Sequence, residues 1–415
     1  MRILLIIMTM LEIFSIEMSA QDDFVKLDRQ TYDYYLKGDY KNLSCTAERM
    51  ISQGIDYYYL RMRLGILSYN KQLYYNALKH FNKALEFNSL DTVSRKYIYY
   101  SYLFSGRKAD ANLYLKSVSG ALDNNKSRLK ERYQSQEFYA ATTVSYSNIS
   151  LYRINNLYYE AIKNSLNINA GFESYFLKRF KGTFSYTNFR KSGTVYSASF
   201  PEGKDLNFSQ DQVYVKLTGY IFPGWEFSGF SQFASYNDIL INGQKTTEYL
   251  GGAGISKNGW KIRTGVNLSF SNFSNSTQTR AEGYVTWLPN GNLNLYFTSG
   301  GMYQSDKTWG STYQINQDVG FRINKSIWME SGINSGNSFL YARNQGFMMN
   351  NSFLIPATTI YGNLICFLNK SFSISFTPFY IEYQSYSWDL DAFTRTGKLI
   401  NNSFGGSIKL KYKYR

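Results

Sequence analysis

The sequence FGGSIKLKYKYR, residues 404–415, alternates two kinds of side chain from Ile408 to its last residue. A helix turns by about 100° per residue and would spread such a pattern around its circumference, whereas a strand places alternate side chains on opposite faces. The pattern therefore predicts a β-strand with one basic and one apolar face. The basic positions are Lys409, Lys411, Lys413 and Arg415, and the apolar positions are Ile408, Leu410, Tyr412 and Tyr414.

The start of the chain has the features of a secretory signal peptide. MRILLIIMTML, residues 1–11, is one positive charge followed by an apolar run, and the small residues of Met-Ser-Ala end at Ala20. The apolar run is shorter than the roughly 20 residues that span a bilayer, which argues against a transmembrane anchor. We expect residues 1–20 to be removed and the protein to be exported without a membrane helix.

Charge and composition narrow the function classes. The chain has a net charge of +15, and residues 126–415 contribute 29 basic and 17 acidic side chains to it. Nucleic acid is a common partner of basic proteins, but we do not expect an exported chain to bind it. Cys45 and Cys366 lie too far apart to indicate a disulfide framework or a thiol metal site, and we expect free buried thiols.

The histidine content bears on catalysis and metal binding. The one histidine, His80, is expected on a helix surface, and residues 126–415 have none. The usual hydrolytic and metal chemistry of histidine is therefore absent from that part of the sequence. We expect no metal, no cofactor and no enzymatic activity.

An internal repeat runs through the N-terminal part. The stretch LGILSYNKQLYYNALKHFNKALEFNS, residues 64–89, has one counterpart before it and one after it at the same interval, and Gly38, Gln72 and Gly106 fall at one common position between the expected helices. On these residues, 24–125 resembles a tetratricopeptide-repeat domain with three repeats, which implies a short solenoid of paired α-helices. Small residues such as Ala77 allow paired helices to approach closely. The recurring positions are Leu43, Ala47 and Met50, then Leu64, Gly65, Ala77, Phe81 and Ala84, then Ile98, Tyr99, Ala111, Leu115 and Val118.

The resemblance also implies a concave groove that binds a periplasmic protein or polymer. The positions that match the groove of that family are Tyr32, Tyr35, Tyr59, Tyr69, Lys96 and Tyr100. The alternative is that these side chains only pack between helices. The sequence leaves both open.

The periodicity changes from 3.6 to 2 after a charged connector, residues 126–138. From residue 139 to residue 415 the chain alternates polar with apolar or aromatic side chains in segments of about ten residues. This is the length that a tilted strand needs to cross a bilayer. We therefore predict an antiparallel transmembrane β-barrel of about 14 strands, within a range of 12 to 16, that closes as a monomer.

The connections between the segments alternate in length. Tight turns such as FPGW and LPNGN lie on one side, and longer polar stretches lie on the other: SGTVYSASFPEGKDLNFSQ, NSGNSFLYARNQGFMMNN and SWDLDAFTRTGK. Outer-membrane barrels have short periplasmic turns and longer extracellular loops. Aromatic residues near the short turns are predicted to form a girdle at the periplasmic interface: Trp225, Trp260, Trp287, Trp328, Tyr220 and Phe222.

The same alternation identifies candidate lumen residues. The predicted basic face consists of Lys216, Lys261, Arg263, Arg280, Arg322, Lys409, Lys411 and Lys413. Carboxylates share this face, namely Glu173, Glu226, Glu282, Asp318 and Glu330. A net basic wall would raise the local concentration of anions. The alternative is that pairs such as Arg280 with Glu282 and Arg322 with Asp318 only fill a narrow lumen.

Two functions remain in view. The order of a signal peptide, repeats and a barrel resembles the outer-membrane porins that export exopolysaccharides and the YaiO-type outer-membrane family. That resemblance implies a channel in the bacterial outer membrane, with both ends of the mature chain in the periplasm, that exports a polysaccharide or another anionic polymer. Three repeats are fewer than polymer exporters usually have, which favours an adaptor whose plugged barrel is only a membrane anchor.

Overall fold

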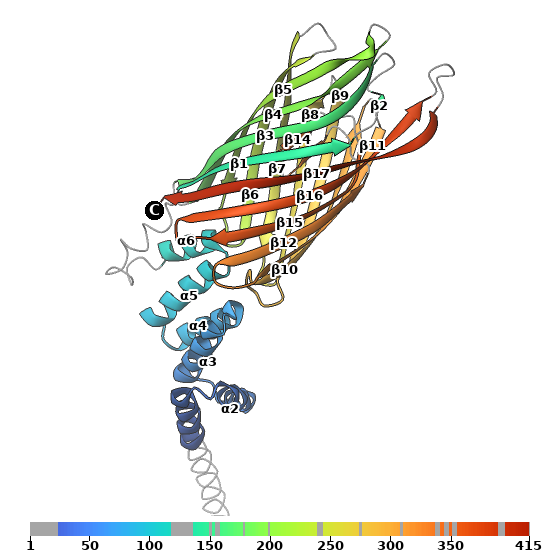
Figure 1. Cartoon of the computed structure of the whole chain (residues 1–415). Coiled ribbons are helices and arrows are strands. Elements are labelled where there is room, and N and C mark those ends of the chain that lie inside the picture. Colours follow the sequence, from blue (N-terminus) through green and yellow to red (C-terminus); the bar gives the residue numbers. More distant parts are fainter. Residues whose placement is uncertain are drawn as a thin grey trace, which may run out of the picture. The chain divides into compact units, whose positions relative to one another are not determined.

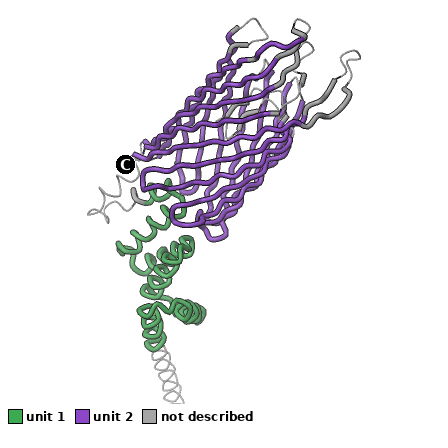
Figure 2. The backbone as a smooth tube through the Cα atoms, in the orientation of Figure 1, with its two compact units in different colours: residues 1–124 green, residues 125–415 purple. Residues whose placement is uncertain are grey.

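The computed structural model describes residues 24–117, 136–148, 152–153, 158–176, 179–197, 200–238, 244–273, 276–307, 310–336, 341–343, 348–350, 355–388 and 395–414. The chain divides into two compact units, residues 1–124 and residues 125–415 (Figure 2). The expected signal peptide, residues 1–20, and most of the expected connector, residues 126–138, lie outside the described residues.

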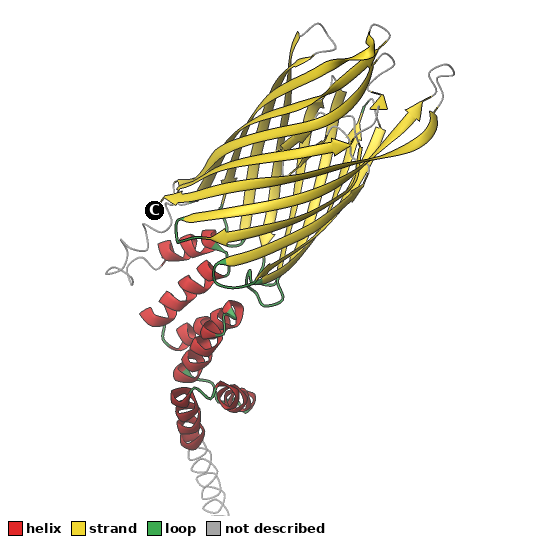
Figure 3. Cartoon of the chain, viewed as in Figure 1, coloured by secondary structure: helices red, strands yellow, loops and turns green. Residues whose placement is uncertain are grey.

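The first unit is helical (Figure 3). A helix over residues 24–37 precedes the labelled helices, which are α2 (Tyr40–Ser52), α3 (Tyr58–Asn70), α4 (Tyr74–Phe87), α5 (Thr92–Phe104) and α6 (Lys108–Ser117). No helix in the described part of the chain is long and apolar enough to cross a membrane.

Helix starts and turns recur at one constant interval in this unit. The first residues of α2, α4 and α6 are evenly spaced along the chain, and the first residues of α3 and α5 are separated by the same interval. The residues that precede the first set all have positive φ: 69° at Gly38, 60° at Gln72 and 79° at Gly106. Glycine adopts this left-handed conformation at little cost, whereas Gln72 adopts it against the preference of an L side chain.

Capping and packing explain where the helices lie. The carboxylate of Asp91 accepts hydrogen bonds from the backbone N–H groups of Val93 (3.1 Å) and Ser94 (2.8 Å) and so begins α5. At the crossing of α3 and α4, a Cβ on Gly65 would collide with the ring of Phe81, which is fully buried. The expected small residues Ala47, Ala77, Ala84 and Ala111 are also fully buried.

The second unit is a closed antiparallel β-barrel of 14 strands (Figures 1 and 3). Neighbours in sequence pair along the sheet, and β1 pairs with both β17 and β3, which closes it. The strands are β1 (Gln136–Asn148), β3 (Tyr158–Phe176), β4 (Phe180–Ser197), β5 (Phe200–Gly219), β6 (Trp225–Asp238), β7 (Gln244–Asn258), β8 (Ile262–Phe273), β9 (Ser276–Trp287), β10 (Leu295–Asp306), β11 (Gly310–Arg322), β12 (Ile327–Gly336), β15 (Ile355–Phe367), β16 (Phe372–Trp388) and β17 (Arg395–Tyr414). The sequence prediction of about 14 strands is confirmed.

Three short strands lie outside this count. Strand β2 (Tyr152–Arg153) pairs with the first residues of β3. Strand β13 (Tyr341–Arg343) pairs with β14 (Met348–Asn350) in a separate hairpin between β12 and β15. The predicted long loop over residues 192–210 is largely wrong, because β4 continues to Ser197 and β5 begins at Phe200. Its Ser, Gly and Pro content suggested a loop, but the two strands pair through most of it.

Contacts between aromatic rings and glycines help to specify the register between neighbouring strands of the barrel. At six places in the described barrel, an inward-facing aromatic side chain covers the glycine directly opposite on the next strand, where a Cβ would overlap the ring. The pairs are Tyr139 with Gly171, Phe230 with Gly252, Tyr284 with Gly265, Tyr296 with Gly320, Tyr361 with Gly332 and Phe379 with Gly405. A shift by one residue would move every ring to the other face, so these pairs specify the register.

The outer wall carries an apolar belt. The outward positions include Val266 and Leu268 on β8 and Ile360 on β15, all about half exposed. Trp225, Trp287 and Phe222 are exposed near the short turns, as the predicted girdle requires. Tyr220 and Trp328 do not belong to that girdle. Tyr220 is 7 % exposed and stacks with Tyr175 at 6.2 Å, and Trp328 is the cross-strand partner of the inward-facing Arg322.

Both cysteines are free. Cys366 is partly buried, but Cys45 is exposed on α2, so the expectation that both thiols are buried was wrong. Leu43 and Ala47 form the buried side of α2, and Cys45, two residues from each, lies on the opposite side because a helix turns by about 100° per residue.

Candidate functional site

The two faces of β17 are divided as the sequence predicts. Ile408, Leu410, Tyr412 and Tyr414 are between 43 and 58 % exposed on the outer wall. The intervening lysines face the barrel interior, where Lys411 pairs with Glu137 at 2.5 Å and Lys413 lies 4.0 Å from the same carboxylate. Arg415 lies outside the described residues.

A basic sector occupies the lumen wall near the short turns, on β17, β1, β3, β4 and β5. We define it as Lys181, Lys216, Lys409, Lys411 and Lys413 with the two carboxylates Glu137 and Glu173. Lys181 pairs with Glu173 at 2.6 Å, and the ammonium of Lys409 lies 4.4 Å from the ring centroid of Tyr139. Five cations and two anions give this sector a net charge of +3.

Solvent reaches the basic sector. The side chains of Lys411, Lys413 and Lys181 are 38, 29 and 24 % exposed even though they face inward. Cations in a low-dielectric, partly hydrated wall attract anions more strongly than the same cations on an open surface. The sector is therefore suited to hold carboxylate, phosphate or sulfate groups.

The facing part of the wall, on β6 to β12, has the opposite balance. Arg280 pairs with Glu282 at 2.9 Å, as predicted. Amides and tyrosine hydroxyls satisfy the other carboxylates: Asn258 donates to Glu226 (2.6 Å), Asn363 (2.9 Å) and Tyr296 donate to Glu330, and Tyr361 donates to Asp318 (2.5 Å). Glu248 and Asp306 also face inward on these strands and are buried. With Arg263 and Arg322, three cations therefore face six carboxylates among the described residues, so the charge of the wall changes sign across the lumen.

Two predictions about this part of the wall need correction. Arg322 does not pair with Asp318, because residues four apart on one strand lie about 13 Å apart. Its guanidinium donates instead to the backbone carbonyl of Asn324 at 2.9 Å. Lys261 is exposed and lies in the bend before β8, outside the strand that places Arg263.

Two residues of the basic sector were missed by sequence reasoning. Glu137 was assigned to the connector, because β1 begins earlier than expected, at Gln136. Lys181 lies at the start of β4, in the alternating stretch FKGTFSY. It follows the outward-facing Phe180, so the alternation of faces along the strand could have identified it as an inward residue. Their cross-strand partners are distant in sequence, so no local pattern linked them.

Four inward side chains in the half of the barrel toward the longer connections are almost fully buried. Gln210, Gln232, Glu248 and Gln304 face inward and are at most 1 % exposed. Gln232 donates to Gln212 at 2.7 Å, and Tyr236 donates to Glu248 at 3.0 Å. We call these four residues the buried layer.

The predicted groove residues of the helical unit separate into two groups. Tyr69 and Tyr100 pack with Phe104, at centroid distances of 6.3 and 5.9 Å, and burial raises the pKa of Tyr69. Tyr35 packs against the core of the first helices. Tyr32, Tyr59 and Lys96 are exposed, with the guanidinium of Arg63 5.2 Å from the ring centroid of Tyr32. The interpretation as packing residues therefore fits the first three, and a groove formed by the last three stays a prediction.

Likenesses to known proteins occur among solved structures alone. No protein-family model matches the chain, and no curated protein matches it. Among solved structures, a deletion mutant of the TodX monoaromatic hydrocarbon channel has a TM-score of 0.49 at 6 % identity, covering 68 % of this chain and 91 % of that one. A Pseudomonas aeruginosa FadL homologue has a TM-score of 0.41 at 9 % identity, covering 68 and 89 %. A bacterial polysaccharide outer membrane secretin has a TM-score of 0.39 at 11 % identity, covering 68 and 99 %.

Proposed function

We propose that the chain forms a channel in the bacterial outer membrane for a hydrophilic, anionic solute or polymer, with an exopolysaccharide as the cargo. A closed barrel with an apolar outer belt satisfies its backbone hydrogen bonds internally and can stand in a bilayer. The inner wall carries lysines, carboxylates and amides, which suit a hydrated cargo and not a hydrocarbon. The proposed role is transport and not catalysis.

The basic sector is the observation that carries this proposal. Its net charge of +3 faces a wall in which carboxylates outnumber cations, so an anionic group that enters from the short turns meets Lys411 and Lys413 first. Lys409 stacks on Tyr139, and its ammonium stays available to a passing anion. Rings beside cations also suit sugar units that carry acidic groups, because sugars pack their apolar faces against aromatic rings.

Current through single reconstituted barrels tests the proposal. The full-length chain in planar bilayers should give steady currents with a reversal potential that shows anion preference under a salt gradient. Lys409→Gln combined with Lys216→Gln should reduce that preference without loss of the heat-resistant folded form. Lys257→Gln is the matched control, because Lys257 lies on the outer wall over the ring of Trp225 at 4.5 Å. Cation preference in the unaltered protein would contradict an anionic cargo.

The second candidate function is an anchored adaptor, and the buried layer favours it. Inward side chains that are at most 1 % exposed are tightly surrounded by other protein atoms, which favours a plugged lumen. A barrel that stays electrically silent at all voltages, while folded and heat-modifiable, would support the adaptor and exclude the channel. The helical unit would then supply the function by holding an envelope or secretion complex.

We propose that the helical unit is a three-repeat tetratricopeptide domain in the periplasm that binds the cargo or its synthesis machinery. The regular recurrence of helix starts and of positive φ at the turns supports this assignment. Tyr32, Tyr59 and Lys96 are the proposed contacts. Residues 24–117 and Tyr414 would lie on the same side of the membrane, so a tag after Arg415 should stay unlabelled in intact cells, and a tag in the β13–β14 hairpin should be labelled.

A further inference from the structure

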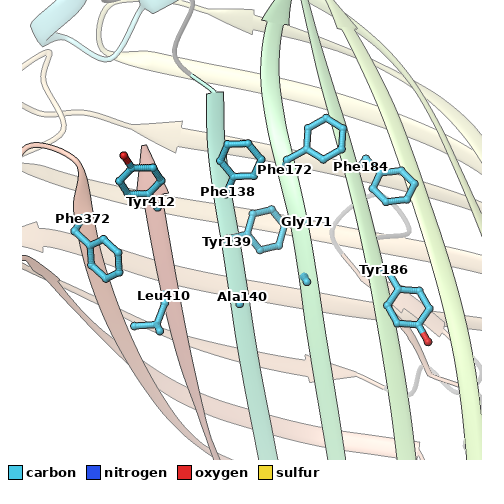
Figure 4. Close-up of a pocket in the computed structure, with 11 residues that line it drawn as sticks. Phe138, Tyr139, Ala140, Gly171, Phe172, Phe184, Tyr186, Phe372, Leu410 and Tyr412 are labelled. Atoms are coloured by element: carbon cyan, nitrogen blue, oxygen red, sulfur yellow. The ribbon is translucent and has the colours of Figure 1, made fainter. Parts of the chain in front are cut away.

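A hollow of about 510 Å³ opens on the outer wall where the barrel closes, across β16, β17, β1, β3 and β4 (Figure 4). Its volume is within the range of about 300–1,000 Å³ that is usual for small-molecule sites. It lies behind the basic sector but on the opposite face of the same strands. None of its lining residues belongs to the lumen site except Tyr139, whose ring lies over Gly171.

The register explains why the wall is hollow there. Ala140 and Ala170 are direct cross-strand partners on the outer face, so two of the smallest side chains meet at one level. Leu410 is opposite Ala140 on one side, and Tyr186 is opposite Ala170 on the other. The two alanines therefore form a floor that lies lower than the side chains of Leu410 and Tyr186 on either side of it.

An aromatic row forms the side of the hollow nearer the short turns. Phe372, Tyr412, Phe138, Phe172 and Phe184 are successive partners at one level of five neighbouring strands. The ring centroids of Phe138 and Phe172 are 6.4 Å apart, and those of Phe172 and Phe184 are 5.7 Å apart. Figure 4 shows these rings beside the bare positions at Ala140 and Gly171.

A polar group limits the hollow at its β4 end. The hydroxyl of Tyr186 donates to Asp211 at 2.6 Å, and Asn188 donates to the same carboxylate at 2.8 Å. An apolar ligand can therefore use the ring of Tyr186 but cannot extend past its hydroxyl. On the other side of the hollow, the aromatic row lies near the short turns. Aromatic belts of membrane proteins lie at this level, where the lipid head groups begin.

We propose that this hollow holds one acyl chain of a phospholipid, with its head group beside the hydroxyl of Tyr412. The inference rests on the proposed membrane location of the barrel and goes beyond its channel function. The hollow is continuous with the lipid-facing belt, so its occupant comes from the bilayer. A flexible acyl chain can descend past the rings onto the two alanines, whereas the convex wall of a second barrel would leave the floor empty.

Native mass spectrometry of the full-length chain, released from membranes in mild detergent, tests the site. We expect one retained phospholipid per barrel. Ala140→Phe, which fills the floor, should reduce the retained fraction about tenfold, and the smaller change Ala170→Leu should act in the same direction. Both side chains face lipid, where larger apolar residues are tolerated by barrels. Ala253→Phe on β7, at an outward position far around the wall, is the matched control and should retain the lipid.

The possible outcomes separate this inference from the proposed function. Equal retention in the unaltered protein and in Ala140→Phe, or equal loss in Ala253→Phe, would overturn the acyl-chain site. A two-chain complex that Ala140→Phe dissociates would identify a second copy as the occupant and would also overturn it. In all of these cases the heat-modifiable barrel remains. A protein that is soluble without detergent and migrates identically with and without boiling would instead refute the membrane location itself.

Discussion

The ring of Tyr284 on β9 covers Gly265, its direct partner on β8, so closely that a Cβ on Gly265 would overlap the ring. Gly283 in the same strand pair faces outward, and a Cβ there would meet only the backbone oxygen of Gly265 at 3.9 Å, an ordinary van der Waals contact. The two glycines therefore perform different tasks in the same hairpin. The first provides room for a neighbour, and the second only leaves the lipid face smooth.

Gly265→Ala should lower the free energy of unfolding by about 1–3 kcal/mol, because the added methyl forces the ring of Tyr284 from its place. The fraction of folded, heat-modifiable protein across a denaturant series measures the effect. Gly283→Ala changes the same strand pair by the same atom and should leave the midpoint nearly unchanged. Equal losses in both variants would show that backbone freedom, and not the ring contact, explains the glycine.

Leu410→Arg should impair insertion by about 2–4 kcal/mol if this position lies near the midplane, because a charge on the lipid face is costly there. Lys409→Gln, the neighbouring inward position, should fold normally. Refolding yield in lipid vesicles compares the two. A comparable loss of refolding yield in both variants would contradict the assignment of Leu410 to the lipid face and Lys409 to the interior.

Gln72→Gly should stabilise the helical unit by about 1 kcal/mol, because the residue between α3 and α4 has a φ of 60°. Thermal unfolding of the full chain, followed by the helical circular-dichroism signal, gives the shift. Gln53→Gly is the control, since Gln53 ends α2 at a φ of −86°. There the greater freedom of glycine in the unfolded chain should give no gain.

Acid should weaken the helical unit through His80. Burial, reinforced by the nearby charge of Arg61, lowers the pKa of His80 from 6.5 to about 4. Between these values the unfolded state binds a proton that the folded state does not, so stability falls as the pH drops from 6.5 toward 4, by on the order of 2 kcal/mol. The melting temperature of His80→Asn should lack this component. An imidazole that titrates near 6.5 in the folded protein, by NMR, would contradict the prediction.

The sequence predicted those features that local patterns encode. The alternation of Leu410 with Lys411 gave the faces of β17, and the recurrence of Gly38 and Gly106 around Gln72 located the turns between helices. Patterns of this kind depend on the geometry of one strand or one turn, so they can be read without knowing the neighbours.

Features that depend on neighbouring strands could not be predicted in this way. Glu137 meets Lys411 only because the first strand pairs with the last. Tyr220 was placed with the outer aromatics by its proximity to a short turn, but the parity of β5 directs it inward. The hollow at Ala140 arises from a register that joins it to Ala170, and neither alanine is unusual in its own strand.

The pairing of β1 with β17 also sets the order in which this barrel can be made. All other neighbouring pairs of barrel strands are also neighbours in sequence, whereas β1 and β17 are separated by all the rest. Joining these two strands therefore closes the largest loop in the unit. Until β17 arrives, both of its future neighbours carry open edges that invite pairing with other chains. A partly assembled unit therefore exposes two strand edges, and only the arrival of the last strand removes both of them.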